Sequence, residues 1–361
     1  MFTPDAKVSD AVRALYERAT VIDGLASPDT YNIPLPPPGI LTPEKLRNVR
    51  ESGISAINLT VGGQGDLATT LRDIGGWMRQ IETHGDYLLL VRQHTDIAQA
   101  AAQKKLGLIF GFQGLGMLGD DLRLVDRFSA LGVNVMQLTY NGRDAFGAGC
   151  ACSDQEGLTP LGHEAVRRMN TLGVLVDVSH ANPTTAAQAV QASSHPIAIT
   201  HTGARAIHTH PRNQPDTVLR AVAESGGVVG IFLMPFLGAD PREASRALFM
   251  RHLRHALDVC GEDHVGIGSD QSITPVEIND DYMAIVRQQA RLRLAQGQGT
   301  PGEGDAPVTV PELNSPRRLE LIAAELDRAG YPPRVLEKVL GQNFDRLFAA
   351  VWPGKGQGTS A

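Results

Sequence analysis

Short apolar runs recur along the chain, and longer segments with helix-like composition separate them. Each run is mostly hydrophobic, several are rich in β-branched residues, and Gly or Pro stands close by, as expected of strands. Eight runs are predicted as strands: Val21–Gly24, Ile54–Leu59, Leu106–Phe112, Val133–Thr139, Val174–Ser179, Ile197–Thr200, Val228–Phe232 and Val265–Ser269. Four intervening segments are predicted as helices: Leu41–Ser52, Gly162–Leu172, Thr184–Ala192 and Ala244–Cys260.

This eightfold alternation of strand and helix predicts an α/β fold of the (β/α)₈ type, a TIM barrel. Most runs are apolar enough for a parallel sheet that is buried on both faces. An open, doubly wound sheet is the alternative, but no glycine-rich dinucleotide fingerprint follows the first strand. We therefore predict one barrel domain over 1–350, with a lid-like insertion around 271–316 and a polar tail over 351–361.

The insertion departs from the rhythm of the barrel. Its segment Gln296–Ala306 reads QGQGTPGEGDA and contains no core-forming residues. Because the segment follows the eighth strand, we expect it to lie over the barrel mouth as a mobile loop or lid. A disordered surface segment is the alternative.

Composition narrows the range of partners. The chain has 361 residues, of which 42% are hydrophobic and 20% charged, as in ordinary globular proteins. The net charge of −6, without a basic cluster, argues against a nucleic-acid partner. No segment approaches the roughly 20 apolar residues of a membrane-spanning helix, and the first residues do not resemble a signal peptide. We expect a cytoplasmic protein with no membrane partner and no disulfide framework among its three cysteines, and leave a homodimer open.

Chemically capable side chains follow several of the predicted strands. His180, His201 and Asp270 stand at such ends, and strand ends converge on the active-site mouth of a barrel. Two histidines and a carboxylate can hold a catalytic metal, and a carboxylate can also accept a proton from attacking water. Arg212 could bind a substrate carboxylate through its guanidinium. The alternatives are hydrogen-bonded structural histidines, a loop-capping aspartate and a structural salt bridge.

Five segments spread over most of the chain carry a resemblance to a known family. They are LTYNGRDAFGAGC (138–150), GLTPLGHEAVRRMNTLGVLVDVSHAN (157–182), ITHTGARAIHTHPRN (199–213), VGIGSD (265–270) and GQNFDRLF (341–348). In these segments, and in their order, the chain resembles the membrane (renal-type) dipeptidases of the amidohydrolase superfamily.

The resemblance implies a site with two zinc ions that share a bridging glutamate. The histidines that match His180 and His201 bind one ion, while the aspartate that matches Asp270 lies by the other and accepts a proton. The arginine that matches Arg212 holds the substrate carboxylate. Tyr140 stands where many members have a histidine that contacts the scissile carbonyl.

The chain departs from the family pattern at three ligand positions. The family's first strand ends in Asp-Gly-His-x-Asp, whereas this chain reads DGLAS, with Leu25 and Ser27 in place of the two ligands. Gln113 replaces the bridging glutamate after the third strand. Leu25 cannot bind a metal, and Gln113 offers only a neutral carbonyl oxygen.

Charge therefore limits the metal content that we expect. Asp270 is the only carboxylate left at the matching positions, and two divalent ions with so little compensating charge are unfavourable. We expect one divalent metal, zinc by preference, on His180 and His201 with Asp270 or Gln113, or no metal at all.

The sequence thus predicts a dipeptidase-like metallohydrolase for a small carboxylate-bearing amide or dipeptide-like molecule. Asp270 and Tyr140 are the predicted catalytic residues, and Arg212 and Tyr140 the predicted substrate-binding residues. Two alternatives are a small-molecule-binding barrel without activity and a metal-free lyase or isomerase.

Overall fold

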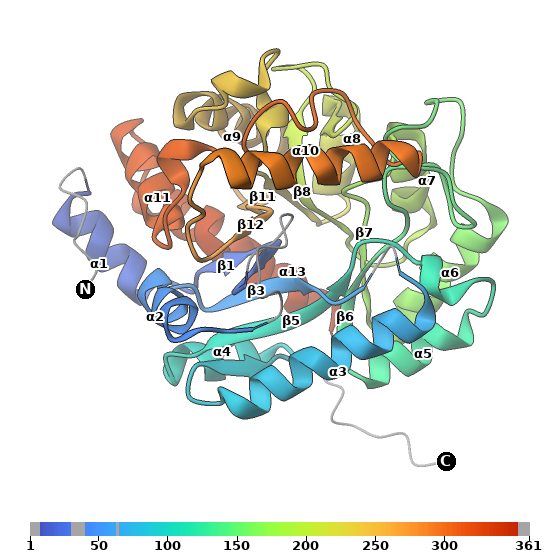
Figure 1. Ribbon diagram of the computed structural model, residues 1–361, viewed down its shortest axis with the longest axis horizontal. Coiled ribbons are helices and arrows are strands. Elements are labelled where there is room, and N and C mark those ends of the chain that lie inside the picture. Colours follow the sequence, from blue (N-terminus) through green and yellow to red (C-terminus); the bar gives the residue numbers. More distant parts are fainter. Residues whose placement is uncertain (1–7, 30–39, 63–64, 353–361) are drawn as a thin grey trace.

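The computed structural model describes residues 8–29, 40–62 and 65–352, and within them a parallel sheet curls into a barrel (Figure 1). The strands neighbour one another in the order β1, β3, β5, β6, β7, β8, β10, β11. Every one of the eight predicted runs contains a strand, so the predicted fold is confirmed. The strands are β1 (Ile22–Asp23), β3 (Ala56–Thr60), β5 (Leu106–Phe112), β6 (Val133–Gln137), β7 (Leu175–Asp177), β8 (Ala198–Ala204), β10 (Val228–Ile231) and β11 (Val265–Ile267).

Contacts between the first and last strands close the barrel. The Gly24 amide donates to the Ile267 carbonyl at 2.8 Å, and the Ser269 amide donates to Asp23 Oδ1 at 2.7 Å. Beyond them β2 (Ala26–Ser27) pairs in parallel with β12 (Gln271–Ser272). Two further short strands were not predicted: β4 (Leu88–Leu90) pairs with β5, and β9 (Asn213–Gln214) pairs with β8.

The four predicted helices are present, with starts that differ by one or two residues. The sequence sets several of these ends: Thr159 caps α6 by accepting from the Gly162 amide, Pro160 occupies the first turn, and Gly173, with φ of 62°, ends the helix. The α-helices are α1 (Asp10–Arg18), α2 (Pro43–Ser52), α3 (Leu67–Thr83), α4 (Thr95–Ala102), α5 (Arg123–Ala130), α6 (Pro160–Leu172), α7 (Pro183–Ala192), α8 (Asp216–Glu224), α9 (Arg246–Cys260), α10 (Asp280–Ala295), α11 (Arg318–Arg328), α12 (Pro333–Glu337) and α13 (Asn343–Val351).

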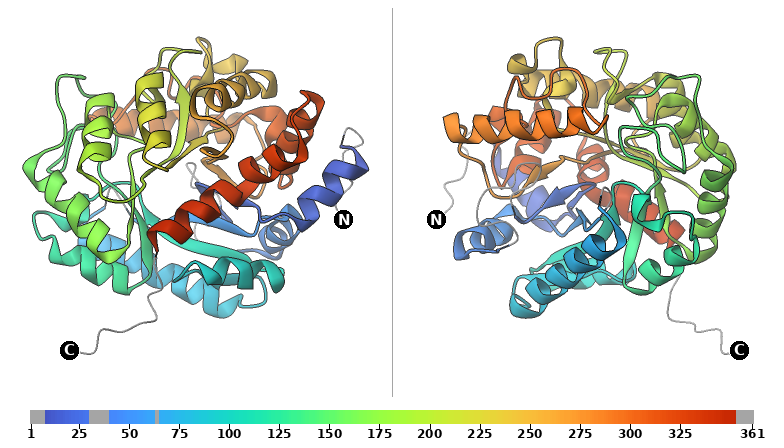
Figure 2. Two further views of the ribbon diagram at one scale, coloured as in Figure 1. Left: turned by 180° about the vertical axis from the view of Figure 1, so that it is seen from behind. Right: turned by 45° about the vertical axis from the view of Figure 1, so that its right-hand side comes forward.

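Helix α13 closes the end of the barrel at which the strands begin. Phe344, Phe348 and Trp352 pack against buried apolar side chains from the first residues of the strands, and α13 crosses the rear view in red (Figure 2, left). The Trp352 indole donates to the Asn134 carbonyl at 3.2 Å. Val351 and Trp352, which we assigned to a polar tail, are therefore part of the core. The remainder of that predicted tail, 353–361, lies outside the described residues.

The insertion after the eighth strand lies at the opposite end of the barrel. Its helix α10 crosses in front of the strands (Figure 1), and the loop over 296–306, here called the mouth segment, follows it. The mouth segment does bury some of its residues, among them Thr300 and Ala306. It packs on the barrel through the polar contacts described below. A segment of low hydrophobicity is therefore held against the barrel by hydrogen bonds.

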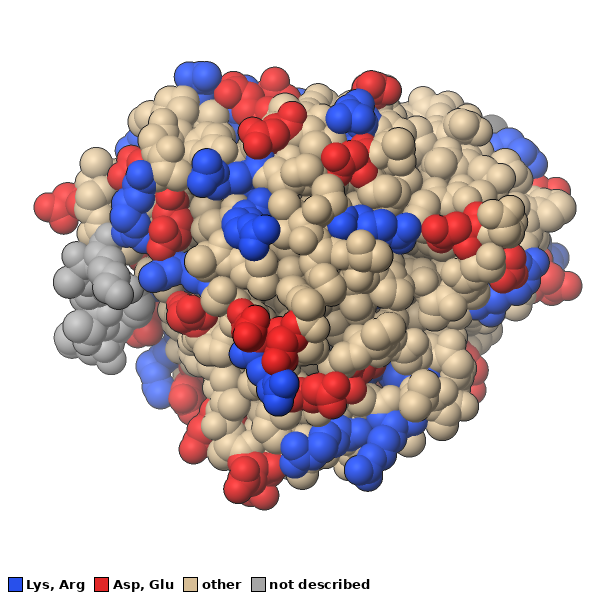
Figure 3. Space-filling model, turned by 90° about the horizontal axis from the view of Figure 1, so that it is seen from above, with Lys and Arg blue, Asp and Glu red and all other residues tan. Residues whose placement is uncertain are grey.

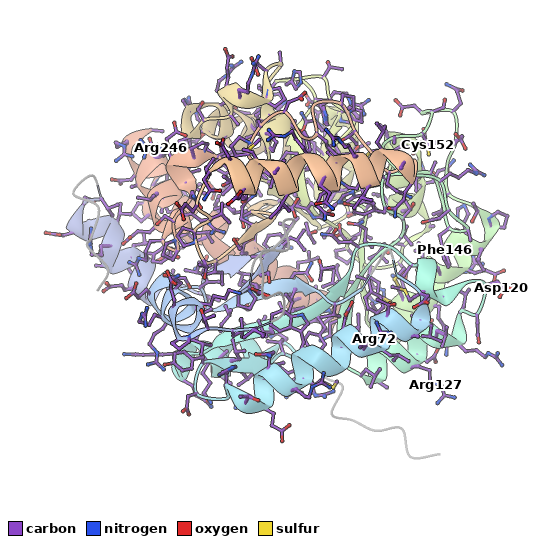
Figure 4. The ribbon with its side chains drawn as sticks, viewed as in Figure 1. Arg72, Asp120, Arg127, Phe146, Cys152 and Arg246 are labelled. Carbon is purple, nitrogen blue, oxygen red and sulfur yellow. The ribbon has the colours of Figure 1, made fainter. Side chains whose placement is uncertain are left out.

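The surface agrees with the charge pattern of the sequence. Basic and acidic side chains are interspersed across the face seen from above, without a uniformly basic area (Figure 3). None of the described helices is long and apolar enough to cross a membrane. The loop from β6 to α6, which carries Phe146 and Cys152, lies on the right of the barrel, and side chains fill the space beneath α10 (Figure 4).

Candidate functional site

Side chains from six strand ends and from the insertion surround one small cavity at the barrel mouth. Its volume is about 30 Å³, room for roughly two water molecules, so the site is closed. The described residues that line it are Gln113, Tyr140, Asn141, His180, Arg212, Met234, Phe236, Asp270, Arg293, Glu303 and Val308. The structure therefore brings Gln113, Tyr140, His180, Arg212 and Asp270 together, and His201 joins them through His180.

The hydrogen bonds of His180 fix which ring nitrogen carries its proton. His180 Nδ1 lies 2.5 Å from Asn141 Oδ1, and Asn141 Nδ2 donates to the Gln298 carbonyl at 2.7 Å. Because a carbonyl only accepts, the Asn141 amide must present its oxygen to His180. His180 therefore carries its proton on Nδ1, and its Nε2 lone pair can accept a hydrogen bond. The Tyr140 ring stacks on this imidazole, with 4.2 Å between centroids.

His201 lies within β8 and has a partner at each ring nitrogen. Its Nδ1 is 2.9 Å from Thr200 Oγ1, and the Thr200 hydroxyl donates to Asp177 Oδ2 at 2.6 Å. His201 Nε2 lies 2.9 Å from His180 Nε2, and because His180 is protonated on Nδ1, this hydrogen bond needs a proton on His201 Nε2 unless an ion takes its place. Burial, reinforced by the Arg212 guanidinium, lowers the pKa of both imidazoles well below the usual value. Two neutral rings thus bring their Nε2 atoms together at one point.

Arg212 is held in the wall of the cavity by contacts on every side. It is buried, and its Nη1 donates to the Ser179 carbonyl while Nη2 donates to His180 Nε2 at 3.1 Å. Its backbone amide donates to His210 Nδ1 at 3.1 Å, and Thr202 Oγ1 donates to its carbonyl. The guanidinium therefore occupies one of the two lone pairs that a metal would need.

Asp270 and Tyr140 complete the polar wall. Asp270 adopts a left-handed conformation with φ of 57°, which is uncommon for a residue with a side chain, and its amide donates to the Leu25 carbonyl at 2.8 Å. Burial raises the pKa of Tyr140 to about 12, with the Arg293 guanidinium opposing the rise and Asp270 adding to it. The phenol therefore keeps its proton at neutral pH and acts as a hydrogen-bond donor.

The two first-strand positions without ligands do not line the cavity, although the Leu25 carbonyl accepts from the Asp270 amide beside it. Leu25 and Ser27 are buried, but neither is among the described residues that line the cavity. Ser27 Oγ instead accepts a hydrogen bond from the Asp29 amide at 3.2 Å. Of the three replaced ligand positions, only Gln113 faces the site.

These residues fit one metal ion at most. His180 and His201 offer two ring nitrogens whose orientation is fixed by partners on Nδ1, as is usual for metal-bound histidines. Within the described residues, however, no three His, Cys, Asp or Glu side chains come together at one point, so Asp270 does not complete a three-ligand set. The Arg212 guanidinium adds a positive charge beside the same nitrogens. A two-metal centre does not fit this donor set.

Three polar residues of the site escaped the sequence analysis. Asn141 directly follows Tyr140 in the LTYN segment, and that adjacency is the one signal that pointed to it. Arg293 and Glu303 come from the insertion, where no strand end marks them. They form an ion pair at 2.6 Å between Arg293 Nε and Glu303 Oε2, and the Glu303 carboxylate also accepts from the Thr300 hydroxyl.

Comparison with solved structures supports the fold. The chain superposes on an amidohydrolase from Pseudomonas aeruginosa with a TM-score of 0.81 and 27% identity, covering 94% of this chain and 99% of the other. A metallopeptidase from Rhodobacter sphaeroides, solved with a phosphinate mimic of the dipeptide L-Ala-D-Ala, shares the fold at a TM-score of 0.74 and 21% identity, covering 92% and 99%.

The curated sequences that match this chain include dipeptidases. The chain is 34% identical over 166 residues to an uncharacterised dipeptidase of Schizosaccharomyces pombe, covering 45% of this chain and 41% of the relative. It is 29% identical over 207 residues to a dipeptidase of Claviceps purpurea, covering 56% and 49%. The matches thus span less than half the length of both relatives. The family model for membrane dipeptidases, peptidase family M19, matches residues 44–285. The chain therefore belongs to the membrane dipeptidase family.

Proposed function

We propose that this protein is a dipeptidase-like hydrolase for a small amide that carries a carboxylate. The convergence of Arg212, Tyr140, Asp270 and the two histidines on one closed cavity, in a member of this family, carries the proposal. A buried guanidinium suits a carboxylate because it forms two parallel hydrogen bonds with it.

The chain's own residues have distinct roles in this scheme. Arg212 binds the substrate carboxylate while its contact with the Ser179 carbonyl keeps the guanidinium in place. The Tyr140 phenol, which stays protonated, donates to the oxygen of the scissile carbonyl as negative charge develops there. Asp270 accepts the proton of the attacking water.

His180 and His201 would hold the single metal ion of this scheme, and imidazole ligands favour zinc. When bound, the ion supplies the Lewis acidity that polarises a carbonyl and lowers the pKa of a water molecule. Two protein nitrogens are fewer than the three ligands of ordinary catalytic zinc sites. We therefore propose an altered centre that binds its ion more weakly than a complete family site.

The contact between Arg212 and His180 favours a second candidate function. An arginine that donates to a potential ligand nitrogen stabilises the site without any metal. Gln113 faces the same cavity without the negative charge of a bridging carboxylate. A barrel that binds a small carboxylate without hydrolysing it is consistent with both features.

Metal content and turnover together test the proposal. Protein purified without chelator is analysed for metal and then assayed with zinc or with a chelator against dipeptides and their carboxamide analogues. We expect at most one ion per chain, and hydrolysis of free-carboxylate substrates only. Arg212→Lys should abolish that preference, whereas Arg220→Lys on the exposed face of α8 should not. Two ions per chain, or equal hydrolysis of the carboxamides, contradicts the proposal, and binding without turnover under all conditions favours the second candidate.

A further inference from the structure

The mouth segment (296–306) contacts the barrel through two side chains that also hold the site. Asn141 Nδ2 donates to the Gln298 carbonyl at 2.7 Å, and its Oδ1 accepts from His180 Nδ1. His210 Nε2 lies 2.9 Å from the Pro301 carbonyl, and its Nδ1 accepts from the Arg212 amide. Each link therefore joins the mouth segment to a cavity residue through a single side chain.

The orientation of the Asn141 side-chain amide links docking of the mouth segment to the tautomer of His180. One side of the amide only donates and the other only accepts, so its orientation favours one of the two tautomers of His180, and with the oxygen toward the ring it favours the tautomer that also accepts from Arg212. The Gln298 carbonyl requires the donor side, and this leaves the oxygen for His180. The other side-chain partner of Asn141 Oδ1 is the Cys150 thiol at 3.2 Å, a weak donor and weak acceptor that accommodates either orientation.

His210 is constrained by the same rule. The Arg212 backbone amide can only donate, so His210 Nδ1 accepts and Nε2 carries the proton that the Pro301 carbonyl receives. The His210 ring stacks on Phe236, with 4.6 Å between centroids, and burial lowers the pKa of His210 to about 4, which keeps the ring neutral. The barrel thus fixes the tautomer of His210 by itself, and His210 offers the mouth segment a donor of fixed orientation.

We infer that docking of the mouth segment stabilises the Nδ1-protonated tautomer of His180 through Asn141, and that Asn141 is a positioning residue of the site. With the segment docked, the Nε2 lone pair of His180 faces the cavity. Without it, the Asn141 amide is free to rotate and present its NH₂ group, which stabilises His180 with its proton on Nε2. That form can neither accept from Arg212 nor bind an ion.

The size of the cavity makes movement of its wall part of any cycle of ligand binding. A volume of about 30 Å³ is far below the roughly 300 Å³ at which pockets for organic ligands begin. Part of the wall has to move to admit a dipeptide-sized molecule, and in this inference the moving part is the mouth segment, which supplies Glu303 to the wall, so that His180 recovers its ligand-competent tautomer when the segment returns. The role of His180 Nε2 as a metal ligand rests on the proposed function, but the coupling between docking of the mouth segment and the tautomer of His180 does not.

Nitrogen NMR of histidine-labelled protein reads the tautomers directly and needs no turnover. Three variants separate the contributions. One replaces residues 297–304 with a short Gly-Ser linker, the second is Gln298→Ala, which removes the acceptor for the Gly142 amide, and the third is Gln296→Ala, an exposed control in the same segment. We expect His180 to be entirely Nδ1-protonated in the parent and the control. The Nε2-protonated form should reach at least about a third of the population in the linker variant and a smaller share in Gln298→Ala.

The variant Asn141→Asp separates the contact of residue 141 with His180 from its contact with Gln298. An aspartate accepts on both oxygens, so it keeps His180 protonated on Nδ1 although it can no longer hold Gln298. We expect faster amide exchange in the mouth segment with an unchanged His180 tautomer. A linker variant whose His180 stays wholly Nδ1-protonated overturns the inference, and so does an Asn141→Asp variant whose His180 moves its proton to Nε2. If either result is found but dipeptides are hydrolysed, the inference fails and the proposed function is retained. If the protein is inactive but the His180 tautomer changes with docking, the proposed function fails and the inference is retained.

Discussion

Replacing Arg212 with methionine should strengthen metal binding at the two histidines. Arg212 Nη2 lies 3.1 Å from His180 Nε2, so an ion on that nitrogen would displace a hydrogen bond and sit beside a guanidinium. Two unit charges about 4 Å apart interact by about 4 kcal/mol at the effective dielectric constant of protein sites, so the repulsion of a divalent ion has an upper bound of about 8 kcal/mol. A quarter of that bound, about 2 kcal/mol, corresponds to roughly a 30-fold change in affinity.

Titration calorimetry of chelator-treated protein with zinc or cobalt measures this change. We expect the ion to bind at least about tenfold more tightly to Arg212→Met than to the parent, while affinity for small carboxylates falls. The Ser179 carbonyl loses its buried donor, which costs about 1–3 kcal/mol of folding stability, so thermal melting must confirm that the variant is folded. Arg220→Met, which removes an exposed charge on α8, is the matched control.

Equal or weaker ion binding by a folded Arg212→Met variant would refute the reasoning. It would mean that the guanidinium does not compete for His180, and that the missing carboxylates alone limit the metal site. A gain in the Arg220→Met control of the same size would instead assign the effect to net charge.

Three further predictions concern single side chains. Tyr140→Phe should lower turnover about 100-fold, and since the pKa of Tyr140 is about 12, the pH–rate profile below pH 10 should keep its shape. Burial raises the pKa of Asp23 from 3.8 to about 6, so the folded protein binds more protons than the unfolded chain in that window and loses stability as the pH rises through it. Asp23→Asn should remove up to about 3 kcal/mol of this pH dependence in urea denaturation experiments at pH 4 and 7, and a variant whose curve parallels that of the parent would contradict this. Trp352→Ala should reduce the free energy of unfolding by about 3–5 kcal/mol, because it leaves a cavity at the end of the barrel where the strands begin. A loss below about 1 kcal/mol would show that Trp352 is not part of the core.

The barrel strands were predictable because each is an apolar run that is buried on both faces. β5 shows this most clearly, since all seven of its residues are buried and its sequence is almost wholly apolar. β4 was missed because the strand is only three residues long, Leu88–Leu90, which is too short to show a periodic pattern. Trp352 was assigned to a tail because the residues after it are polar, whereas its burial depends on how α13 packs against the distant strands.

The strand-end rule located part of the site and not the rest. It placed His180 and Asp270 at the cavity because they follow parallel strands, whose ends meet at one mouth. Arg212 precedes the short strand β9, and both its guanidinium chemistry and the family resemblance assigned it to a substrate carboxylate. Arg293 and Glu303 lie in an insertion where neither hydrophobic period nor strand end marks a functional residue.

The first-strand positions show why a ligand count describes the site only in part. Reading Leu25 and Ser27 as missing ligands assumes that both positions still face the metal, yet neither is among the described residues of the cavity wall. The Leu25 carbonyl accepts the Asp270 amide, which helps to close the barrel beside the site. Arg212 donates to His180 Nε2, and Asn141 links the same ring to the mouth segment. Hydrogen bonds from this chain's own residues thus engage both nitrogens of His180, and a count of ligand positions does not include them.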